Sequence, residues 1–301
     1  MPLTADVAIS SWLSRNTGRS FASAPAAEVA GGSVYRCVRW ASESSDAFVK
    51  LAAADSLAAL EAEAAGLQAL AKADALRVPA VLAVGDAGGH ALLALEWLDL
   101  EPAAASDGTV QAQLGERLAM QHRRTAPRCG WQRENTIGAT PQLNAWDDDW
   151  VRFFRERRLG FQLGLAGANG LHSNVVERGR ELGERCGAFF SSYRPVPSLL
   201  HGDLWGGNWG VVSGSREPAI FDPAVYYGDR ETDIAMTRLF GGFGPRFYAA
   251  YQAAWPLDQA ASTRRTLYNL YHVLNHFNLF GGGYGRQAQA MIDKLLAELG
   301  I

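Results

Sequence analysis

The alternation of hydrophobic and polar residues divides the chain into a strand-rich beginning and a helix-rich remainder. Short apolar runs bounded by Gly, Asp and Ser predict strands at residues 28–38, with a glycine turn inside, and at 47–51, 80–84 and 91–96. The i, i+3, i+4 spacing of leucines predicts a helix at residues 56–73, and a shorter amphipathic helix is expected at 6–15. A turn is expected at residues 85–89.

Helical periodicity dominates the rest of the chain. It predicts helices at residues 110–124, 144–159, 173–193, 262–280 and 286–299, and another that opens within 226–235. Two short strands, at 209–212 and 219–221, are joined by turn-rich residues. The pattern therefore indicates an α+β protein with a β-rich part at residues 1–98 and a mainly helical part at 99–301, which begins with the linker-like stretch 102–108.

Composition narrows the class of protein. Of the 301 residues 48% are hydrophobic and 20% are charged, which excludes wholesale disorder. With 28 basic and 31 acidic side chains the chain lacks the positive field of a nucleic-acid-binding protein, so no nucleic-acid partner is expected. No apolar run approaches the ~18 residues of a membrane span, so no membrane partner is expected. Three scattered cysteines and the lack of a signal pattern favour the cytoplasm.

Candidate chemistry concentrates between the strand pair at 209–221 and the apolar residues before it. Asp203 follows a His-Gly pair, Asn208 lies five positions later, and Asp222 follows the second strand, so the hairpin would return Asp222 to Asn208. This is the layout of kinases. Phosphoryl transfer needs a carboxylate to accept the proton of the attacking hydroxyl, and hard oxygen ligands to hold Mg²⁺. Asp203 is thus the candidate catalytic base, and Asn208 and Asp222 are the candidate metal ligands.

Each of these three residues has another interpretation, because Asp and Asn are also common turn residues. Their ordered combination, more than any one of them, favours a catalytic site. Asp222 is followed by Pro223 where protein kinases have Phe-Gly, which points to small-molecule kinases of the same fold.

A lysine and a glutamate in the first part are candidates for phosphate orientation. Lys50 stands alone in an apolar strand, where a buried ammonium group needs an anionic partner. Glu63 lies close to the apolar stripe of the following helix, whereas Glu61 points away from it. We therefore expect a Lys50–Glu63 ion pair; a solvated glutamate and an edge-strand lysine are the alternative.

Two further stretches are candidates for nucleotide binding. A glycine pair can let backbone N–H groups approach a phosphate, although it is more often a plain turn. The chain is expected to cross between the two parts just after the last strand, where backbone groups can pair with an adenine edge. These candidates are Gly31, Gly32, Glu96 and Leu98.

Polar residues in the helical part suggest a substrate pocket. Asp229 and Asp233 are clustered acids that could receive a cationic substrate or anchor the catalytic loop, with the anchoring role favoured for Asp233. His272 and Asn275 are polar positions in a largely apolar helix, which suggests a pocket wall, but such a histidine is commonly a hydrogen-bonded core residue. Residues 130–138 form a glycine-flanked polar loop that binds ligand or merely connects.

Several stretches, taken in order, resemble the fructosamine kinases, also called ketosamine kinases, within the aminoglycoside-phosphotransferase and choline-kinase-like group. The resemblance spans nearly the whole chain, and Trp205, the GDRE run and the LNH triplet make it more specific than HGD alone. The stretches are FVK at 48–50, EAAGLQAL at 63–70, ENTIGATPQLN at 134–144, LLHGDLWGGN at 199–208, IFDPAVYYGDRETDIAM at 220–236 and LYHVLNHFNLFGG at 270–282.

The resemblance implies a two-lobed protein-kinase-like fold with ATP and Mg²⁺ between the lobes. It also implies phosphorylation of the C3 hydroxyl of a ketosamine, free or protein-bound, by a monomer or homodimer, after which the adduct falls apart and releases its amine. By position, Trp205 lies along the substrate. The glycine loop departs from the family pattern, with Ser33-Val34-Tyr35 after the glycine pair, which puts its contacts to ATP in question. A kinase of an aminoglycoside or amino alcohol is the alternative, and a nucleotide-binding module without turnover fits less well because the catalytic residues are intact.

Overall fold

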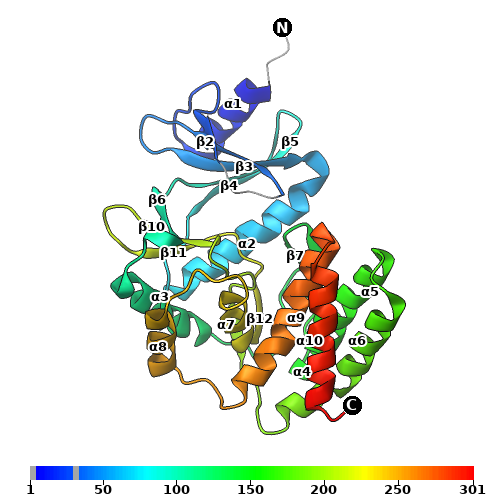
Figure 1. The fold of residues 1–301 in the computed structure, drawn as a ribbon. Helices are drawn as coiled ribbons and strands as arrows, with labels where there is room; N and C mark the ends of the chain where they lie inside the picture. The colour runs from blue at the N-terminus through cyan, green and yellow to red at the C-terminus, as the bar shows by residue number, and fades with distance from the viewer. Residues whose placement is uncertain (1–4, 30–33) are drawn as a thin grey trace.

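The N-terminal part is a five-stranded antiparallel sheet in the order β1-β2-β3-β5-β4 (Figure 1). The computed structural model describes residues 5–29 and 34–301. The strands are β1 (Ala27–Glu28), β2 (Arg36–Trp40), β3 (Ala47–Ala53), β4 (Val81–Ala87) and β5 (His90–Glu96). Helices α1 (Ala5–Thr17) and α2 (Leu57–Ala73) pack on this sheet.

The sheet separates two apolar layers, because successive side chains of a strand point to opposite faces. Val49 and Leu51 of β3 pack in one cluster with Leu13 of α1. Leu93 of β5 belongs to the other cluster, which contains the leucine stripe of α2. Lys50, between Val49 and Leu51, therefore points to the face that α2 covers.

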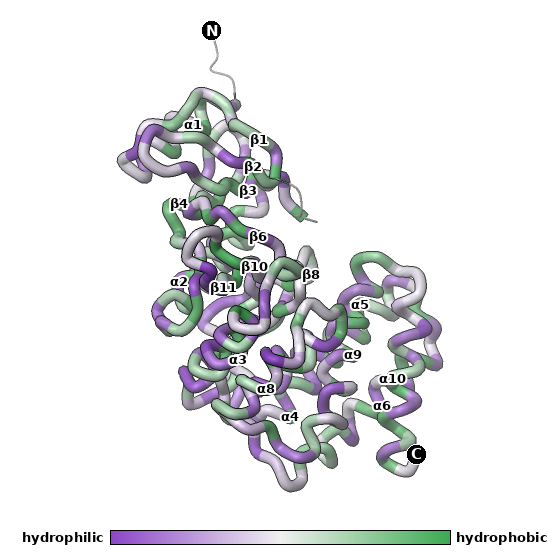
Figure 2. Tube along the Cα trace, turned by 60° about the vertical axis from the view of Figure 1, so that its left-hand side comes forward, coloured by the Kyte–Doolittle hydropathy of each residue, from purple (hydrophilic) through white to green (hydrophobic). Residues whose placement is uncertain are grey.

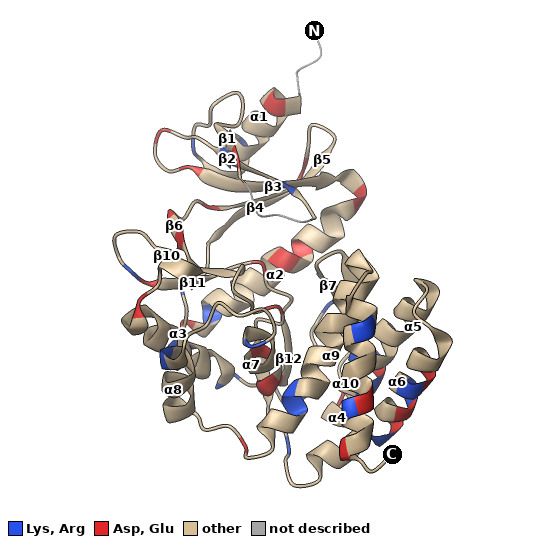
Figure 3. Ribbon diagram, viewed as in Figure 1, with Lys and Arg blue, Asp and Glu red and all other residues tan. Residues whose placement is uncertain are grey.

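The second part is mainly helical. Acidic and basic positions are interspersed along α6, and hydrophobic and hydrophilic positions alternate along α6 and α10, as expected for helices with one buried face (Figures 2 and 3). No helix in the described ranges is long and apolar enough to cross a membrane. The helices are α3 (Gly108–His122), α4 (Trp150–Phe153), α5 (Phe161–Ala168), α6 (Ser173–Arg185), α7 (Glu231–Thr237), α8 (Pro245–Ala254), α9 (Ala261–Phe280) and α10 (Tyr284–Glu298).

Besides the five-stranded sheet, the described residues form three small sheets, and two of them flank the residues between β9 and β12. The chain leaves the five-stranded sheet at Glu96, and β6 then pairs with β10, which in turn pairs with β11. The hairpin predicted at residues 209–221 is thus confirmed, whereas the pairing with β6 was not foreseen. The strands are β6 (Leu100–Pro102), β7 (Asn135–Ile137), β8 (Thr140–Gln142), β9 (Pro197–Leu200), β10 (Trp209–Val212), β11 (Pro218–Ile220) and β12 (Tyr226–Asp229).

The helix predicted at residues 144–159 is wrong at both ends. It begins at Trp150, because the Asp149 side chain caps it by accepting a hydrogen bond from the Arg152 N–H at 2.9 Å. The backbone of Asn144 is instead held in a loop by Glu134. The helical path continues past residue 159 through a π-helical stretch, Phe154–Gly160, into α5.

Other boundaries differ for similar local reasons. The helix expected to open within residues 226–235 is α7, which begins at Glu231, and residues 226–229 before it form β12 because they pair with β9. The helix predicted at 173–193 ends as α6 at Arg185 and continues as a 3₁₀ turn, Cys186–Phe190. The turn expected at 85–89 is confined to Gly88 and Gly89, where positive φ angles favour glycine. Helix α8 and the β7–β8 hairpin were missed.

Candidate active site

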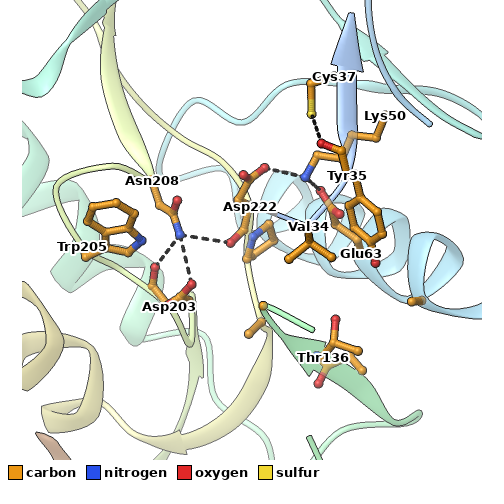
Figure 4. A pocket seen from close by; sticks show the side chains of 15 residues that line it. Val34, Tyr35, Cys37, Lys50, Glu63, Thr136, Asp203, Trp205, Asn208 and Asp222 are labelled. Carbon is orange, nitrogen blue, oxygen red and sulfur yellow. Dashed lines mark hydrogen bonds and ion pairs between the residues drawn. The ribbon is translucent and has the colours of Figure 1, made fainter. Parts of the chain in front are cut away.

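Asp203 and Asn208 lie in the loop between β9 and β10, and Asp222 follows β11, so the hairpin brings all three residues to one cavity (Figure 4). The Asn208 amide Nδ2 donates to the Asp203 carbonyl at 2.8 Å and to Asp203 Oδ2 at 3.2 Å. It also reaches the Asp222 carbonyl at 3.4 Å. The structure therefore places the candidate base next to both candidate metal ligands.

Lys50 reaches the same cavity from the N-terminal sheet. Its Nζ lies 2.7 Å from Glu63 Oε1 and 2.7 Å from Asp222 Oδ1 (Figure 4). Burial opposes the charge of Lys50, but attraction to the two carboxylates outweighs it and raises the Lys50 pKa. The expected Lys50–Glu63 pair is thus present, and the link to Asp222 ties the two parts of the chain together.

Asp222 and Asn208 have oxygen atoms suited to a hard cation. Asp222 has a φ of 56°, a left-handed conformation that Asp tolerates better than most residues. One of its carboxylate oxygens bonds Lys50 while the side chain remains 40% exposed. The Asn208 amide nitrogen is used by its hydrogen bonds, which leaves the amide oxygen as a ligand atom. These residues fit Mg²⁺, which is usually held by one or two carboxylates together with substrate phosphates.

Asp203 has the environment of a proton acceptor. Burial, followed by the nearby charge of Asp222, raises the pKa of Asp203 to about 7, although the hydrogen bond from Asn208 acts in the opposite direction. A carboxylate with a pKa near the working pH is a stronger base than an ordinary aspartate. The electrostatics of the site thus agree with the role predicted for Asp203.

A buried hydrogen-bond network holds the catalytic loop, the segment between β9 and β10. The sequence did not predict the individual contacts of this network. Asp233 of α7 accepts hydrogen bonds from the His201 N–H at 2.8 Å and the Gly202 N–H at 2.9 Å, and it contacts His122 Nε2 at 3.1 Å. Burial alone raises the pKa of Asp233, but the hydrogen bond from His122 and the other donors outweigh it and lower that pKa. The anchoring role favoured for Asp233 from its position agrees with these contacts.

His201 connects the catalytic loop to the segment that follows β11. Its Nε2 donates to the Phe221 carbonyl at 2.9 Å, and its Nδ1 accepts from the Asp203 N–H at 3.3 Å. Gly202 allows this close approach, because its φ is 84° and a Cβ there would meet the Ala224 carbonyl oxygen at 2.0 Å. The HGD triplet therefore combines a connector, a tight turn and the candidate base.

We predict that Asp233→Asn lowers kcat about tenfold and the free energy of unfolding by about 1–3 kcal/mol, because an amide cannot accept all of these N–H groups and leaves a buried donor unpaired. The KM for ATP should stay close to that of the unaltered protein. Steady-state kinetics and chemical unfolding test this. Asp148→Asn, at a carboxylate that is 75% exposed, is the matched control. An unchanged kcat would show that Asp233 does not position the loop.

The cavity walls come from both parts of the chain. Trp205 lines the cavity near Asp203, and Thr136 and Gly138 of the polar loop at 130–138 line its other side (Figure 4). A second, adjoining pocket contains Glu96 and Leu98. The Glu96 N–H already donates to the Ala80 carbonyl, so that N–H is not available to a nucleotide. Gly31 and Gly32, the other predicted nucleotide contacts, lie outside the described residues.

Three predicted substrate contacts do not face the cavity. Asp229 is fully buried, where its oxygens accept hydrogen bonds from Tyr193 at 2.9 Å and from Tyr268. Asn275 is buried and donates to the Ile137 carbonyl, while His272 is 3% exposed within α9. The structure therefore does not bring Asp229, His272 and Asn275 to the cavity, because core packing has satisfied or enclosed these groups.

A small antiparallel sheet and a larger helical part, with a cavity lined by Lys50, Asp203, Asn208 and Asp222, define a two-lobed protein-kinase-like fold. The chain belongs to the fructosamine kinase family, whose model matches residues 5–298. The family resemblance and the fold class expected from the sequence are both confirmed.

Individual relatives cover almost the whole chain. A protein of Synechocystis named as a probable ketoamine kinase is 42% identical over 96% of this chain and 96% of its own. The chloroplastic protein-ribulosamine 3-kinase of Arabidopsis thaliana is 39% identical over 90% of this chain and 82% of its own.

Solved structures show the same fold. A crystal structure from Haemophilus somnus, assigned by name as a fructosamine-3-kinase, is 28% identical, with a TM-score of 0.86 over 96% of this chain and 97% of its own. The spectinomycin phosphotransferase solved with ADP and spectinomycin is 12% identical, with a TM-score of 0.57 over 99% of this chain and 95% of its own, and shares the fold alone.

Proposed function

We propose that the protein is an ATP-dependent kinase that phosphorylates the C3 hydroxyl of ketosamines, the fructosamine and ribulosamine adducts of amines. The observation that carries this proposal is the meeting of Lys50, Asp203, Asn208 and Asp222 in one cavity of a fructosamine kinase family member. Substrates are free or protein-bound ketosamines. The phosphorylated adduct would then break down and release the amine, which is deglycation of that amine.

The chain's own residues divide the task. The sugar hydroxyl oxygen attacks the γ-phosphate of ATP, with ADP as the leaving group, and Asp203 accepts the proton of that hydroxyl. Lys50, oriented by Glu63, holds the nucleotide phosphates. Asn208 and Asp222 would hold Mg²⁺, which neutralises the charge that develops on the phosphate oxygens. The Trp205 indole lies along the sugar and shields the reacting atoms from water.

We assign the two ends of ATP to the two pockets. Residues 1–98 form the nucleotide-binding lobe and residues 99–301 the catalytic and substrate lobe. The adenine would lie in the second pocket, between Phe48 and Leu95 on one side and Phe221 on the other. Backbone groups of Glu96 and Leu98, other than the occupied Glu96 N–H, would lie at its edge. The phosphates would then extend toward Lys50. We place the enzyme in the cytoplasm.

ADP release measured with a substrate panel tests this function. Ribulose-, fructose- and erythrulose-type adducts of one amine should each raise ADP production, whereas the free amine, an aminoglycoside and an amino alcohol should not, because only the adducts carry the C3 hydroxyl next to a ketone. Product analysis should place the phosphate on C3. ADP release with the aminoglycoside or amino alcohol and none with the adducts would contradict the proposal.

A further inference from the structure

Four aromatic rings form a continuous row from the catalytic cavity to the surface. Trp205 lines the cavity (Figure 4) and contacts Phe240 edge to face, with ring centroids 6.3 Å apart. Phe240 lies 4.7 Å from His276, which lies 5.6 Å from Phe280. Trp205 and Phe240 are each 39% exposed, and Phe280 is 60% exposed. We call Trp205, Phe240, His276 and Phe280 the aromatic row.

Three separate segments build the row, so it is not simply one face of a helix. Trp205 comes from the catalytic loop, Phe240 from the connection between α7 and α8, and the other two rings from the end of α9. The first two segments are in van der Waals contact, because a Cβ on Gly242 would lie 2.5 Å from the Gly206 Cα atom. The end of α9 also packs against the cavity wall, since a Cβ on Gly138, which lines the cavity, would meet Leu279 at 3.1 Å.

The charges around the row suit one end of a ketosamine. The described residues that line the cavity include the carboxylates of Glu63, Asp203 and Asp222 but only one ammonium group, that of Lys50. Burial lowers the pKa of His276, so its ring is neutral at pH 7 and the outer row carries no charge. A cation entering beside Trp205 would meet aromatic faces and nearby acids, both of which attract it.

We propose that the aromatic row is the subsite for the amine end of the ketosamine, and that it selects amines that carry an apolar or aromatic group. This inference rests on the proposed function. In a ketosamine the nitrogen is three bonds from the C3 atom whose hydroxyl reacts at Asp203. The protonated amine therefore lies beside Trp205 and Phe240, and its substituent extends over His276 and Phe280.

Exposed aromatic patches also mark contacts between proteins. A second copy of the chain is the other occupant to consider. The substrate is favoured because the row begins inside the catalytic cavity and is continuous with it, whereas a surface made for self-association has no need of a ring that lines the site.

The test compares ribulose adducts of phenethylamine and of methylamine, which differ only beyond the nitrogen. The unaltered enzyme should have a kcat/KM about 3- to 10-fold higher for the phenethylamine adduct, chiefly through KM, because an aromatic contact contributes that much to binding. Phe280→Ser should lower kcat/KM for this adduct by a larger factor than for the methylamine adduct, and Phe280→Tyr should restore most of the preference. Met120→Ser, at a side chain that is 50% exposed on α3, should change neither value.

Three outcomes would contradict the subsite or the proposed function. Equal losses for both adducts in Phe280→Ser, with an unchanged thermal unfolding midpoint, would overturn the subsite. An unchanged preference in Phe280→Ser, together with a particle mass in sedimentation smaller than that of the unaltered protein, would also overturn the subsite. That result would assign the row to contacts between copies. If the unaltered enzyme turns over neither adduct while it binds ATP, the proposed function itself fails.

Discussion

Asp203→Asn is expected to lower kcat for ketosamine phosphorylation about 10²–10⁴-fold, the range that a positioned general base contributes. Asparagine keeps the size of the side chain and can still bond Asn208, but it cannot accept the proton of the sugar hydroxyl. ATP affinity should remain nearly unchanged, because Asp203 belongs to the chemical step and Lys50 to nucleotide binding. Single-turnover kinetics and ATP titration measure the two quantities separately.

A stability measurement separates lost chemistry from lost folding in this variant. Burial and the charge of Asp222 disfavour ionised Asp203 and raise its pKa, so the uncharged amide should unfold at the same temperature or a higher one at pH 8. Asp148→Asn, at the surface, should retain full activity. Retained activity in Asp203→Asn would refute its role as the base.

Arg264→Met is expected to lower the free energy of unfolding by about 3–5 kcal/mol and the midpoint by roughly 10 °C, because it leaves a buried carboxylate without its partner. Arg264 is 1% exposed and pairs through two nitrogens with Glu231, which is 3% exposed, at 2.8 and 2.9 Å. Its guanidinium also bonds Asp258 at 2.7 Å. Thermal and denaturant unfolding measure the loss.

Two companion variants test the cause of that loss. Arg265→Met changes the exposed neighbour on the same helix and should have little effect. Combining Arg264→Met with Glu231→Gln removes both charges and should recover part of the lost stability, because no unpaired charge remains buried. If the double variant is less stable than Arg264→Met, the unpaired carboxylate is not the reason for the loss.

The candidate site was predictable where its residues are close in sequence or chemically unusual. Asp203, Asn208 and Asp222 are connected by one short hairpin, and its β10–β11 register brings them together. Lys50 was conspicuous because a single ammonium group in an apolar strand requires a partner, and Glu63 lies on the helix face that supplies one. In both cases the local sequence pattern and the chemistry of the side chains restrict which residues can form the site.

Polarity alone was an ambiguous signal. Asp229, His272 and Asn275 were polar residues in apolar surroundings, which describes a pocket wall and a satisfied core position equally well. Their burial and the tyrosine partners of Asp229 come from elements distant in sequence. The ring contacts of Trp205 with Phe240, and of Phe240 with His276, likewise could not be predicted from the sequence.

The sequence by itself determined the class of this protein, its strands and most of its helices, and the residues able to transfer a phosphate, because periodicity and spacing act over short distances along the chain. Only the tertiary structure decided which polar groups are enclosed, that Lys50 also reaches Asp222 across 172 positions, and that three segments align their rings beside the cavity. Those outcomes depend on packing between distant elements, and a pattern of neighbouring residues does not contain that information.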